Sequence, residues 1–173
     1  MQINVKYLDP EMPPLEAVDK GDWIDARAVH VQVNGEKINW ELNKMSARDE
    51  IKFSSMDRVK VGLGLAMHFP PVYEAHIRPR SSLFKRHGLL MTNGLGVIDH
   101  TYCGNTDEWF AEFFAVYDGF ISRFERLCQW RLIERMPRPE FVSVQDLGNP
   151  SRGGHGSTGR DMYIEAQEDD GFQ

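Results

Sequence analysis

The sequence predicts an all-β protein, a sandwich or barrel with at most one or two short helices. Apolar residues recur at every second position along much of the chain, which is typical of half-buried strands. Trp109–Tyr117 is dense in aromatic residues, and Leu127–Leu132 is another β-like run. Glycine and proline separate such runs, for example at Pro70-Pro71 and Gly104. Short strands punctuated by turn residues indicate the all-β class.

The first hairpin is predicted around Asn34-Gly35. Val29–Val33 and Ile38–Leu42 flank this dipeptide, which favours a two-residue hairpin turn because both turn positions take a positive φ. The next strand is expected over Val59–Met67, where every second residue is apolar. The polar stretch Asn43–Asp57 between them is expected to form a loop or an extended hairpin tip.

One short segment has the features of a helix. Ser81 or Ser82 is suited to cap a helix over Leu83–His87, and Gly88 is suited to end it in a left-handed conformation.

Length, charge and cysteine content narrow the classes of function. The 173 residues suit one domain that buries a core without disulfides or a structural metal. The net charge of −6 argues against a protein held to nucleic acid by bulk electrostatics, so an anionic ligand requires a few placed cations, backbone N–H groups or a metal. Cys103 and Cys128 belong to no metal-ligand motif, and residues 1–10 contain no apolar signal segment. We expect a soluble, unexported protein of a reducing cytoplasm.

The C-terminal part differs in composition from the rest. Residues 148–160 combine Pro150 with several glycines and hydroxyl residues, which do not pack as a regular element. Residues 161–173 carry acidic side chains and neither lysine nor arginine, as expected of a solvated tail. We therefore expect a β domain over residues 1–147, a glycine-rich arm over 148–160 and an acidic tail over 161–173.

Five clusters of polar residues are candidates for chemistry. The first, Gly21–Ala28, places Asp25 at the start of a strand, where an aspartate is most often an ordinary surface carboxylate. The second joins Arg80, Ser81 and Ser82 just before the expected helix, whose free N–H groups and dipole attract anions. Taken alone, a serine cap beside a solvated arginine is the simpler explanation of the second cluster.

The third cluster, Asn93–Gly104, is typical of a glycine-flanked β-hairpin whose backbone a planar ligand can approach closely. Asp99 follows two apolar residues and is expected to be partly desolvated at a pocket wall, where a carboxylate can orient or deprotonate a water. Tyr102 offers a flat ring. A tight hairpin with a turn aspartate accounts for the same segment equally well.

The fourth and fifth clusters are Arg126–Trp130, which contains Gln129, and Ser151–Gly159. A lone glutamine in a strand usually faces solvent. The fifth cluster predicts an arm that wraps an oligophosphate with N–H and O–H donors, although it is no Walker loop because no lysine follows the glycines. The alternative is a flexible linker. Arg152 and His155 argue against a mere linker.

In this order, the five clusters closely resemble the motifs of the trimeric dUTPase family, and within it the branch of Gram-positive bacteria and their phages. The corresponding segments are Gly21–Ala28, Arg80–Ser82, Asn93–Gly104, Arg126–Gln129 and Arg152–Gly159. The likeness extends from Val5 to Gly159. It implies a distorted jelly-roll β-barrel of the dUTPase-like β-clip type, with one short helix, assembled as a homotrimer that exchanges its C-terminal arms.

The resemblance also implies a reaction, the hydrolysis of dUTP to dUMP and pyrophosphate, which lowers dUTP and supplies dUMP for thymidylate synthesis. Water attacks the α-phosphorus, with Asp99 positioning that water and Tyr102 stacking under the deoxyribose. The uracil edge is assigned to the residues of the third motif, Asn93, Gly96, Val97 and Ile98.

The phosphates and the lid are assigned in the same way. A neighbouring subunit contacts the phosphates through Arg80, Ser81, Ser82 and Gln129. Mg²⁺, held chiefly by the triphosphate and water, is the implied cofactor, and Asp25 reaches its hydration shell. The arm of the third subunit closes over the nucleotide with Arg152 on the γ-phosphate, and its other contacts are His155, Gly156, Ser157 and Thr158. No nucleic acid or membrane partner is implied.

The sequence departs from the usual family pattern at several positions. His155 stands where most of the family has a phenylalanine that stacks on uracil, and an imidazole stacks more weakly and with pH dependence. Phe124-Glu125 replaces the usual glycine-aspartate before Arg126. Residues 34–58 are longer than the typical connection, and this extension is a candidate partner-binding surface.

Two other functions stay open on the sequence alone. The dCTP deaminases of the same superfamily share the fold and the arginine-serine segment, but they use a glutamate near the pocket and lack a glycine-rich closing arm. The chain is alternatively an interaction protein that keeps the dUTPase fold and binds a regulator, which is compatible with catalysis. Release of pyrophosphate from dUTP, of ammonia from dCTP, or of neither distinguishes the three.

Overall fold

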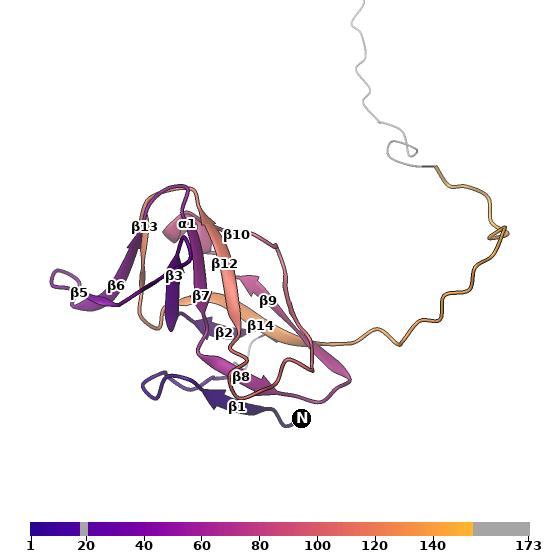
Figure 1. Cartoon of the computed structure of the whole chain (residues 1–173), viewed down its shortest axis with the longest axis horizontal. Helices are drawn as coiled ribbons and strands as arrows, with labels where there is room; N and C mark the ends of the chain where they lie inside the picture. The colour runs from indigo at the N-terminus through magenta and orange to yellow at the C-terminus, as the bar shows by residue number, and fades with distance from the viewer. Residues whose placement is uncertain (18–20, 154–173) are drawn as a thin grey trace, which may run out of the picture. The chain divides into compact units, whose positions relative to one another are not determined.

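A computed structural model describes residues 1–17 and 21–153, which form β-strands and one short helix (Figure 1). The chain divides into two units, Met1–Pro137 and Arg138–Gln173, and all of the described strands lie in the first. The all-β class is confirmed. Among the described residues, no helix has the length and apolar character needed to cross a membrane.

The strands are short and follow the alternation of apolar residues. The first eight are β1 (Asn4–Tyr7), β2 (Ile24–Arg27), β3 (His30–Val33), β4 (Glu36–Ile38), β5 (Glu41–Asn43), β6 (Arg48–Phe53), β7 (Arg58–Gly62) and β8 (Leu65–His68). The remaining elements are β9 (Tyr73–Pro79), α1 (Leu83–His87), β10 (Leu89–Met91), β11 (Gly96–Ile98), β12 (Phe110–Ala115), β13 (Gly119–Ser122) and β14 (Arg126–Glu134).

The described strands form antiparallel sheets that share one hydrophobic core. The two larger sheets have the orders β10-β12-β7-β3-β4 and β11-β9-β14-β2, and the smaller ones are β13-β6-β5 and β1-β8. Trp109, just before β12, meets Trp130 of β14 edge to face with ring centroids 5.4 Å apart. Buried Ala75 and Ile77 alternate with polar residues along β9, so the polar residues lie on the outer face of the four-stranded sheet.

The two cysteines lie in opposite environments. Cys128 is buried in β14, and this burial raises the pKa of its thiol to about 12. Cys103 is exposed in the connection between β11 and β12.

The predicted hairpin turn and the helix are both confirmed. The second strand expected over Ile38–Leu42 is wrong, because β4 ends at Ile38 and the next strand, β5, pairs with β6. Asn34 and Gly35, with φ of 52° and 90°, join β3 to β4. Helix α1 has Ser82 at its N-cap and ends at Gly88, whose φ is 64°. The side chain of Ser82 makes no capping hydrogen bond.

The single strand expected over Val59–Met67 is wrong, since the segment forms two strands. β7 ends at Gly62 and β8 begins at Leu65, with Gly64 between them at φ 65°. The left-handed glycine turns the chain, so β7 pairs in the five-stranded sheet while β8 pairs with β1. The apolar alternation continues through the turn because both strands face the core.

Of the two alternatives for Asn43–Asp57, the extended hairpin tip is confirmed and the loop is wrong for residues 48–53. Arg48–Phe53 form β6, which pairs with both β5 and β13. Ile51 and Phe53 are buried in the core, and this packing against distant strands outweighs the polar character of the surrounding sequence.

The hairpin expected over Asn93–Gly104 is replaced by a connection between two sheets. Gly94 lies in the turn at φ 63°, but β10 pairs with β12 and β11 pairs with β9. The strands on either side of the turn therefore belong to different sheets.

Candidate active site

The segment from Arg80 to Ser82 joins the end of β9 to helix α1. The Arg80 N–H donates to the Leu127 carbonyl of β14 at 3.0 Å, and the first helical residue, Leu83, is buried. These contacts fix the backbone, while Ser81 is exposed and Ser82 half-exposed. Two hydroxyl groups are thus presented beside Arg80.

Asp25 holds two arginines at this end of the sheet. Its Oδ1 accepts from Nε of Arg80 at 2.9 Å, and its Oδ2 accepts from Nη1 of Arg126 at 3.0 Å. Asp25 is half-buried, and both arginine side chains keep contact with solvent. The guanidinium groups are therefore held in place while their side chains remain partly open to solvent.

Gln129 lies in the same cross-strand row. On β14 it is opposite Asp25 of β2 on one side and Arg78 of β9 on the other. Its neighbours Cys128 and Trp130 are buried, so Gln129 points from the outer face. The structure thus brings together six residues, which we call the arginine cluster: Asp25, Arg80, Ser81, Ser82, Arg126 and Gln129.

Asp99 follows β11 and is held by its own loop, residues 99–104. Its Oδ1 accepts from the N–H and the hydroxyl of Thr101 at 2.8 and 2.7 Å, and lies 3.1 Å from Nδ1 of His100. The hydrogen bonds from Thr101 lower the pKa of Asp99 below its ordinary value, and the charges of His100 and Arg135 act in the same direction. The carboxylate is therefore ionised at neutral pH.

The expectation that Asp99 is partly desolvated is wrong for the single chain. Its side chain is 52% exposed. The physical reason is that the loop follows β11, an edge strand, so no further strand of the described chain lies beside it.

Tyr102 closes the same loop. Its N–H donates to the Asp99 carbonyl at 3.0 Å, and its hydroxyl donates to the Glu108 carbonyl at 3.1 Å. Partial burial raises the pKa of Tyr102, and nearby acidic side chains act in the same direction. The phenol is therefore neutral, and part of its ring remains open to solvent.

The residues expected to bind a base edge lie on and before β11. As an edge strand, β11 has one side of its backbone unpaired within the described chain. Asn93 and Val97 are exposed, and Ile98 is half-buried. Gly96 is buried against Ile77, whose Cβ would lie 3.2 Å from a Cβ added at Gly96. The open strand edge offers N–H and C=O groups to a flat ligand.

The arginine cluster and Asp99 lie at opposite ends of the four-stranded sheet. Ile98, just before Asp99, is opposite Ala75 of β9, whereas Arg80 lies five residues after Ala75. At about 3.3 Å per residue along a strand, this separates the two regions by roughly 16 Å. Within one chain the predicted site therefore exists as two separate halves.

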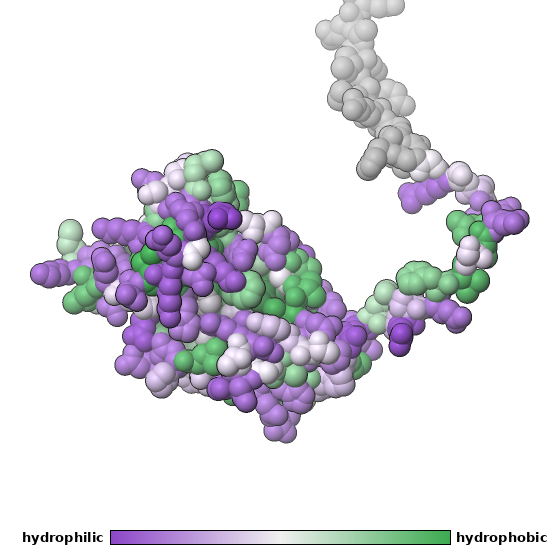
Figure 2. All heavy atoms as spheres, viewed as in Figure 1, coloured by the Kyte–Doolittle hydropathy of each residue, from purple (hydrophilic) through white to green (hydrophobic). Residues whose placement is uncertain are grey.

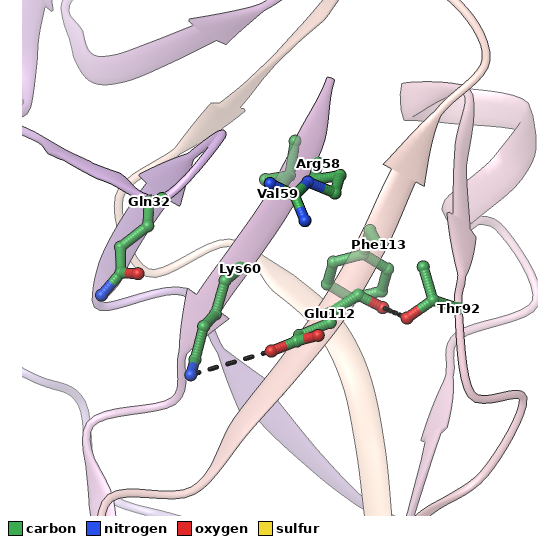
Figure 3. Close-up of a pocket in the computed structure, with 8 residues that line it drawn as sticks. Gln32, Arg58, Val59, Lys60, Thr92, Glu112 and Phe113 are labelled. Atoms are coloured by element: carbon green, nitrogen blue, oxygen red, sulfur yellow. Dashed lines mark hydrogen bonds and ion pairs between the residues drawn. The ribbon is translucent and has the colours of Figure 1, made fainter. Parts of the chain in front are cut away.

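A different region of the surface contains a hollow of about 250 Å³, on the outer face of the five-stranded sheet (Figure 3). Lys60 points across it toward Glu112, with Nζ 3.7 Å from Oε1. None of the predicted site residues lines this hollow, and its lysine is already paired with a carboxylate.

Comparison with known proteins assigns the family. Residues 44–159 match the family model described as dUTPase. The chain is 41% identical over 159 residues to the SPbeta prophage-derived deoxyuridine 5'-triphosphate nucleotidohydrolase of Bacillus subtilis strain 168, a match that covers 92% of this chain and 99% of the relative. This chain belongs to the dUTPase family.

Solved dUTPase structures share the fold. A mutant dUTPase of Staphylococcus bacteriophage 80alpha with dUpNHpp has a TM-score of 0.66 at 14% identity, over 92% of this chain and 99% of that chain. A mutant dUTPase from phage phi11 of S. aureus, described with a structural Mg(II) ion, has a TM-score of 0.62 at 14% identity, over 85% of this chain and 99% of that chain. These two matches show that the fold is shared, and the 41% identical prophage relative places the chain in the phage-like Gram-positive branch of dUTPases.

Part of the predicted dUTPase site lies outside the described residues. His155, Gly156, Ser157 and Thr158 fall within 154–173. Arg152 is described and exposed, in a segment without helix or strand. The assignment of residues 148–160 as a closing arm stays a prediction.

The departure of this dUTPase at Phe124-Glu125 has a structural consequence. Phe124 has φ 61°, a left-handed conformation that favours glycine. Its ring packs against the core, with the Arg123 guanidinium 4.5 Å from the ring centroid, which offsets part of the strain. Glu125 lies 3.1 Å from Nε2 of His87, so the turn before β14 is tied to the helix that follows the two serines.

Sequence reasoning missed residues that position the dUTPase side chains. Thr101 was detectable, because a threonine two residues after an aspartate commonly bonds its carboxylate in a turn. Arg126 was noted in its motif without its ion pair to Asp25. Arg135 contacts His100 from 35 residues away, and no local pattern links them.

Proposed function

We propose that this chain hydrolyses dUTP to dUMP and pyrophosphate in sites that neighbouring copies of the chain complete. Family membership supports the reaction. The observation that supports shared sites is the separation of Asp99 from the arginine cluster within one chain. A water that attacks the α-phosphorus lies beside the phosphates, so one substrate requires Asp99 of one chain and the arginine cluster of another.

Asp99 is the residue that we assign to the attacking water. Its Oδ1 is occupied by Thr101, whereas Oδ2 has no hydrogen-bond partner in the part of the chain that the structure describes. Oδ2 is therefore free to accept from a water. Because its pKa is lowered, the carboxylate is ionised and can take the proton of that water as the bond to phosphorus forms. Pyrophosphate leaves in line with the attack.

The arginine cluster is proposed to bind the phosphates. Arg80 and Arg126 bring two positive charges, and the hydroxyl and amide groups of the cluster add neutral donors. Asp25 holds both guanidinium groups before substrate arrives, so little reorganisation is needed as charge develops in the transition state. This local arrangement allows a chain of net charge −6 to bind a polyanion.

Mg²⁺ is the cofactor that we propose. The described residues contain no group of three or more His, Cys, Asp or Glu side chains that could hold a metal ion, so the triphosphate and water supply most ligands. Asp25 fits a contact through water, because each of its oxygens accepts one arginine hydrogen bond and retains a lone pair. When bound, the ion neutralises charge on the phosphate oxygens.

The region around β11 is proposed to select uracil. The open backbone edge of Gly96–Ile98 and the exposed Asn93 offer donors and acceptors to a base edge. A site built from such pairs strongly rejects a base with the wrong pattern. Tyr102 is proposed to stack under the deoxyribose, and Arg152, with the arm beyond it, to close over the phosphates.

A homotrimer is proposed from the family resemblance, and the segment after Pro137 supports assembly. Phe141 is 91% exposed in the single chain, and Val142, Val144 and Leu147 are also exposed. Figure 2 shows apolar residues along the coloured part of this segment. Several exposed apolar side chains within a few residues indicate a segment that another chain covers. Exchange of this segment between copies accounts for its composition.

Incubation of the purified chain with dUTP, dCTP and Mg²⁺ tests the reaction. We expect pyrophosphate from dUTP and no ammonia from dCTP. Ammonia from dCTP would instead identify a deaminase of the same fold.

Mixed assemblies test the shared sites. At a dUTP concentration far below the raised KM of Arg80→Ala, chains with Asp99→Asn or Arg80→Ala are each expected to show little activity. Their co-expression is expected to restore part of the activity, because some sites then combine an intact Asp99 with an intact arginine cluster. A mixture as inactive as its components would show that both halves come from one chain.

A further inference from the structure

His100 lies between Asp99 and Arg135, the residue that directly follows β14. Its Nδ1 is 3.1 Å from Oδ1 of Asp99 and 2.9 Å from Nη1 of Arg135. The imidazole is largely covered, at 24% exposure, whereas the neighbouring carboxylate is half-exposed. The ring therefore forms the inner wall against which Asp99 rests.

Arg135 is itself fixed by backbone groups. The backbone N–H of Arg135 donates to the Val72 carbonyl, and its guanidinium Nη1 donates to the Pro71 carbonyl, both at 2.8 Å. These residues directly precede β9, the strand that pairs with both β11 and β14. The position of Arg135, and through it that of His100, is thus set by the sheet rather than by the loop.

Nδ1 of His100 can satisfy only one of its two neighbours at a time. With a hydrogen on Nδ1, the ring donates to Oδ1 of Asp99, and its unprotonated Nε2, 3.4 Å from Nη1, can accept from Arg135. In this tautomer the ring holds Oδ1 and leaves Oδ2 on the open side of the carboxylate.

We propose that His100 and Arg135 are positioning residues that hold the Asp99 carboxylate in the orientation required by the attacking water. This inference rests on the proposed role of Asp99. Thr101 restrains Oδ1 from within the same exposed loop, and the contact through His100 adds a restraint from the sheet. Loss of that restraint lets the carboxylate rotate, which affects turnover more than nucleotide binding because the phosphates are bound elsewhere.

Steady-state kinetics of the full-length protein with dUTP and Mg²⁺ test the proposal. We expect His100→Ala and Arg135→Ala each to lower kcat about tenfold while KM stays within about twofold. His100→Asn is expected to retain most of the turnover, because its amide N–H can still donate to Asp99. The double alanine variant is expected to lose no more kcat than the single variant with the larger loss, since both residues act through one contact.

Controls separate this role from a general loss of structure. His68→Ala removes an exposed histidine at the end of β8 and is expected to leave kcat and KM unchanged. Melting temperatures are measured for every variant. If His100→Ala does not fold, the same comparison is made between Arg135→Ala and Arg135→Lys. The lysine variant is then expected to keep more of the kcat than the alanine variant.

Three outcomes would overturn the positioning role: unchanged kcat in His100→Ala, equal losses in the alanine and asparagine variants, or losses that add in the double variant. Asp99→Asn separates failure of the positioning role of His100 from failure of the role assigned to Asp99. If Asp99→Asn is inactive and His100→Ala is normal, only the positioning role fails. If Asp99→Asn is active, the assignment of Asp99 itself fails.

Discussion

The arginine cluster and the Asp99 loop are built in different ways, although we assign them to one reaction. The cluster stands on paired strands, and each oxygen of Asp25 accepts from an arginine within the single chain. The Asp99 loop follows an edge strand, and its carboxylate is half-exposed. The half that we assign to phosphate binding is therefore pre-formed, whereas the half that we assign to water activation is open.

This difference implies that binding and chemistry respond to different changes. Pre-formed donors bind phosphates with little loss of conformational freedom. An open carboxylate reaches a desolvated setting only when other chains and the arm surround it, which strengthens its interaction with the reacting groups. Substitutions in the cluster should therefore act mainly on KM, and changes around the loop mainly on kcat.

Asp99→Asn is expected to have the largest effect. An amide cannot take the proton of the attacking water, so kcat should fall by about 10² to 10⁴-fold, while nucleotide affinity changes little because the arginine cluster is intact. Single-turnover rates and calorimetric titration with dUTP measure the two quantities. Near-normal turnover would show that another group activates the water.

Truncation after Gly148 is expected to have the second largest effect on activity. None of residues 149–153, the described part of the removed segment, belongs to the hydrophobic core. We therefore expect a folded trimer to remain, with activity lowered about a hundredfold because the substrate is no longer enclosed and positioned. Light scattering, thermal unfolding and turnover measure assembly, stability and activity. Dissociation of the truncated protein would contradict this picture, since the assembly would then depend on the arm.

Asp25→Asn is expected to have a smaller effect, on binding. The amide cannot pair with both guanidinium groups, so the arginines lose their fixed positions, and KM for dUTP should rise about tenfold with a smaller change in kcat. Asp22→Asn is a matched control, because Asp22 is 85% exposed and lies 3.9 Å from its nearest arginine partner, Arg131. Equal effects of the two substitutions would argue against a specific role for Asp25.

Thr101→Val is expected to have the smallest effect, visible only in acid. Valine keeps the backbone N–H but removes the hydroxyl bond, one of the interactions that lower the pKa of Asp99. The ionised carboxylate is the active form, so a less lowered pKa moves the acid limb of the kcat profile to higher pH and leaves the neutral rate almost unchanged. Movement to lower pH would assign that limb to another group.

The sequence predicted local elements better than strand pairings. The Asn34-Gly35 turn and the helix over Leu83–His87 depend on the backbone preferences of a few adjacent residues. The break at Gly64 and the strand β6 depend on partner strands far along the chain, and a single sequence does not contain that information.

In the candidate site, too, the sequence predicted local groups of residues better than contacts between distant positions. Residues within a motif, such as Arg80–Ser82, were found because they are contiguous. The pair between Asp25 and Arg126 joins positions 101 residues apart, and the contact of Arg135 with His100 is also long-range. The sequence thus identified the residues that we propose to face the substrate and missed some of the contacts that hold them in place.

The contrast between the two cysteines makes the protein suitable for labelling without any substitution. The thiol of Cys128 is buried and stays protonated, because burial raises its pKa to about 12, whereas Cys103 is exposed one residue after Tyr102. Maleimide dyes react with accessible thiolates, so a fluorophore would attach at Cys103. Its emission would then follow, in real time, the arrival of a nucleotide sugar and the covering of the site.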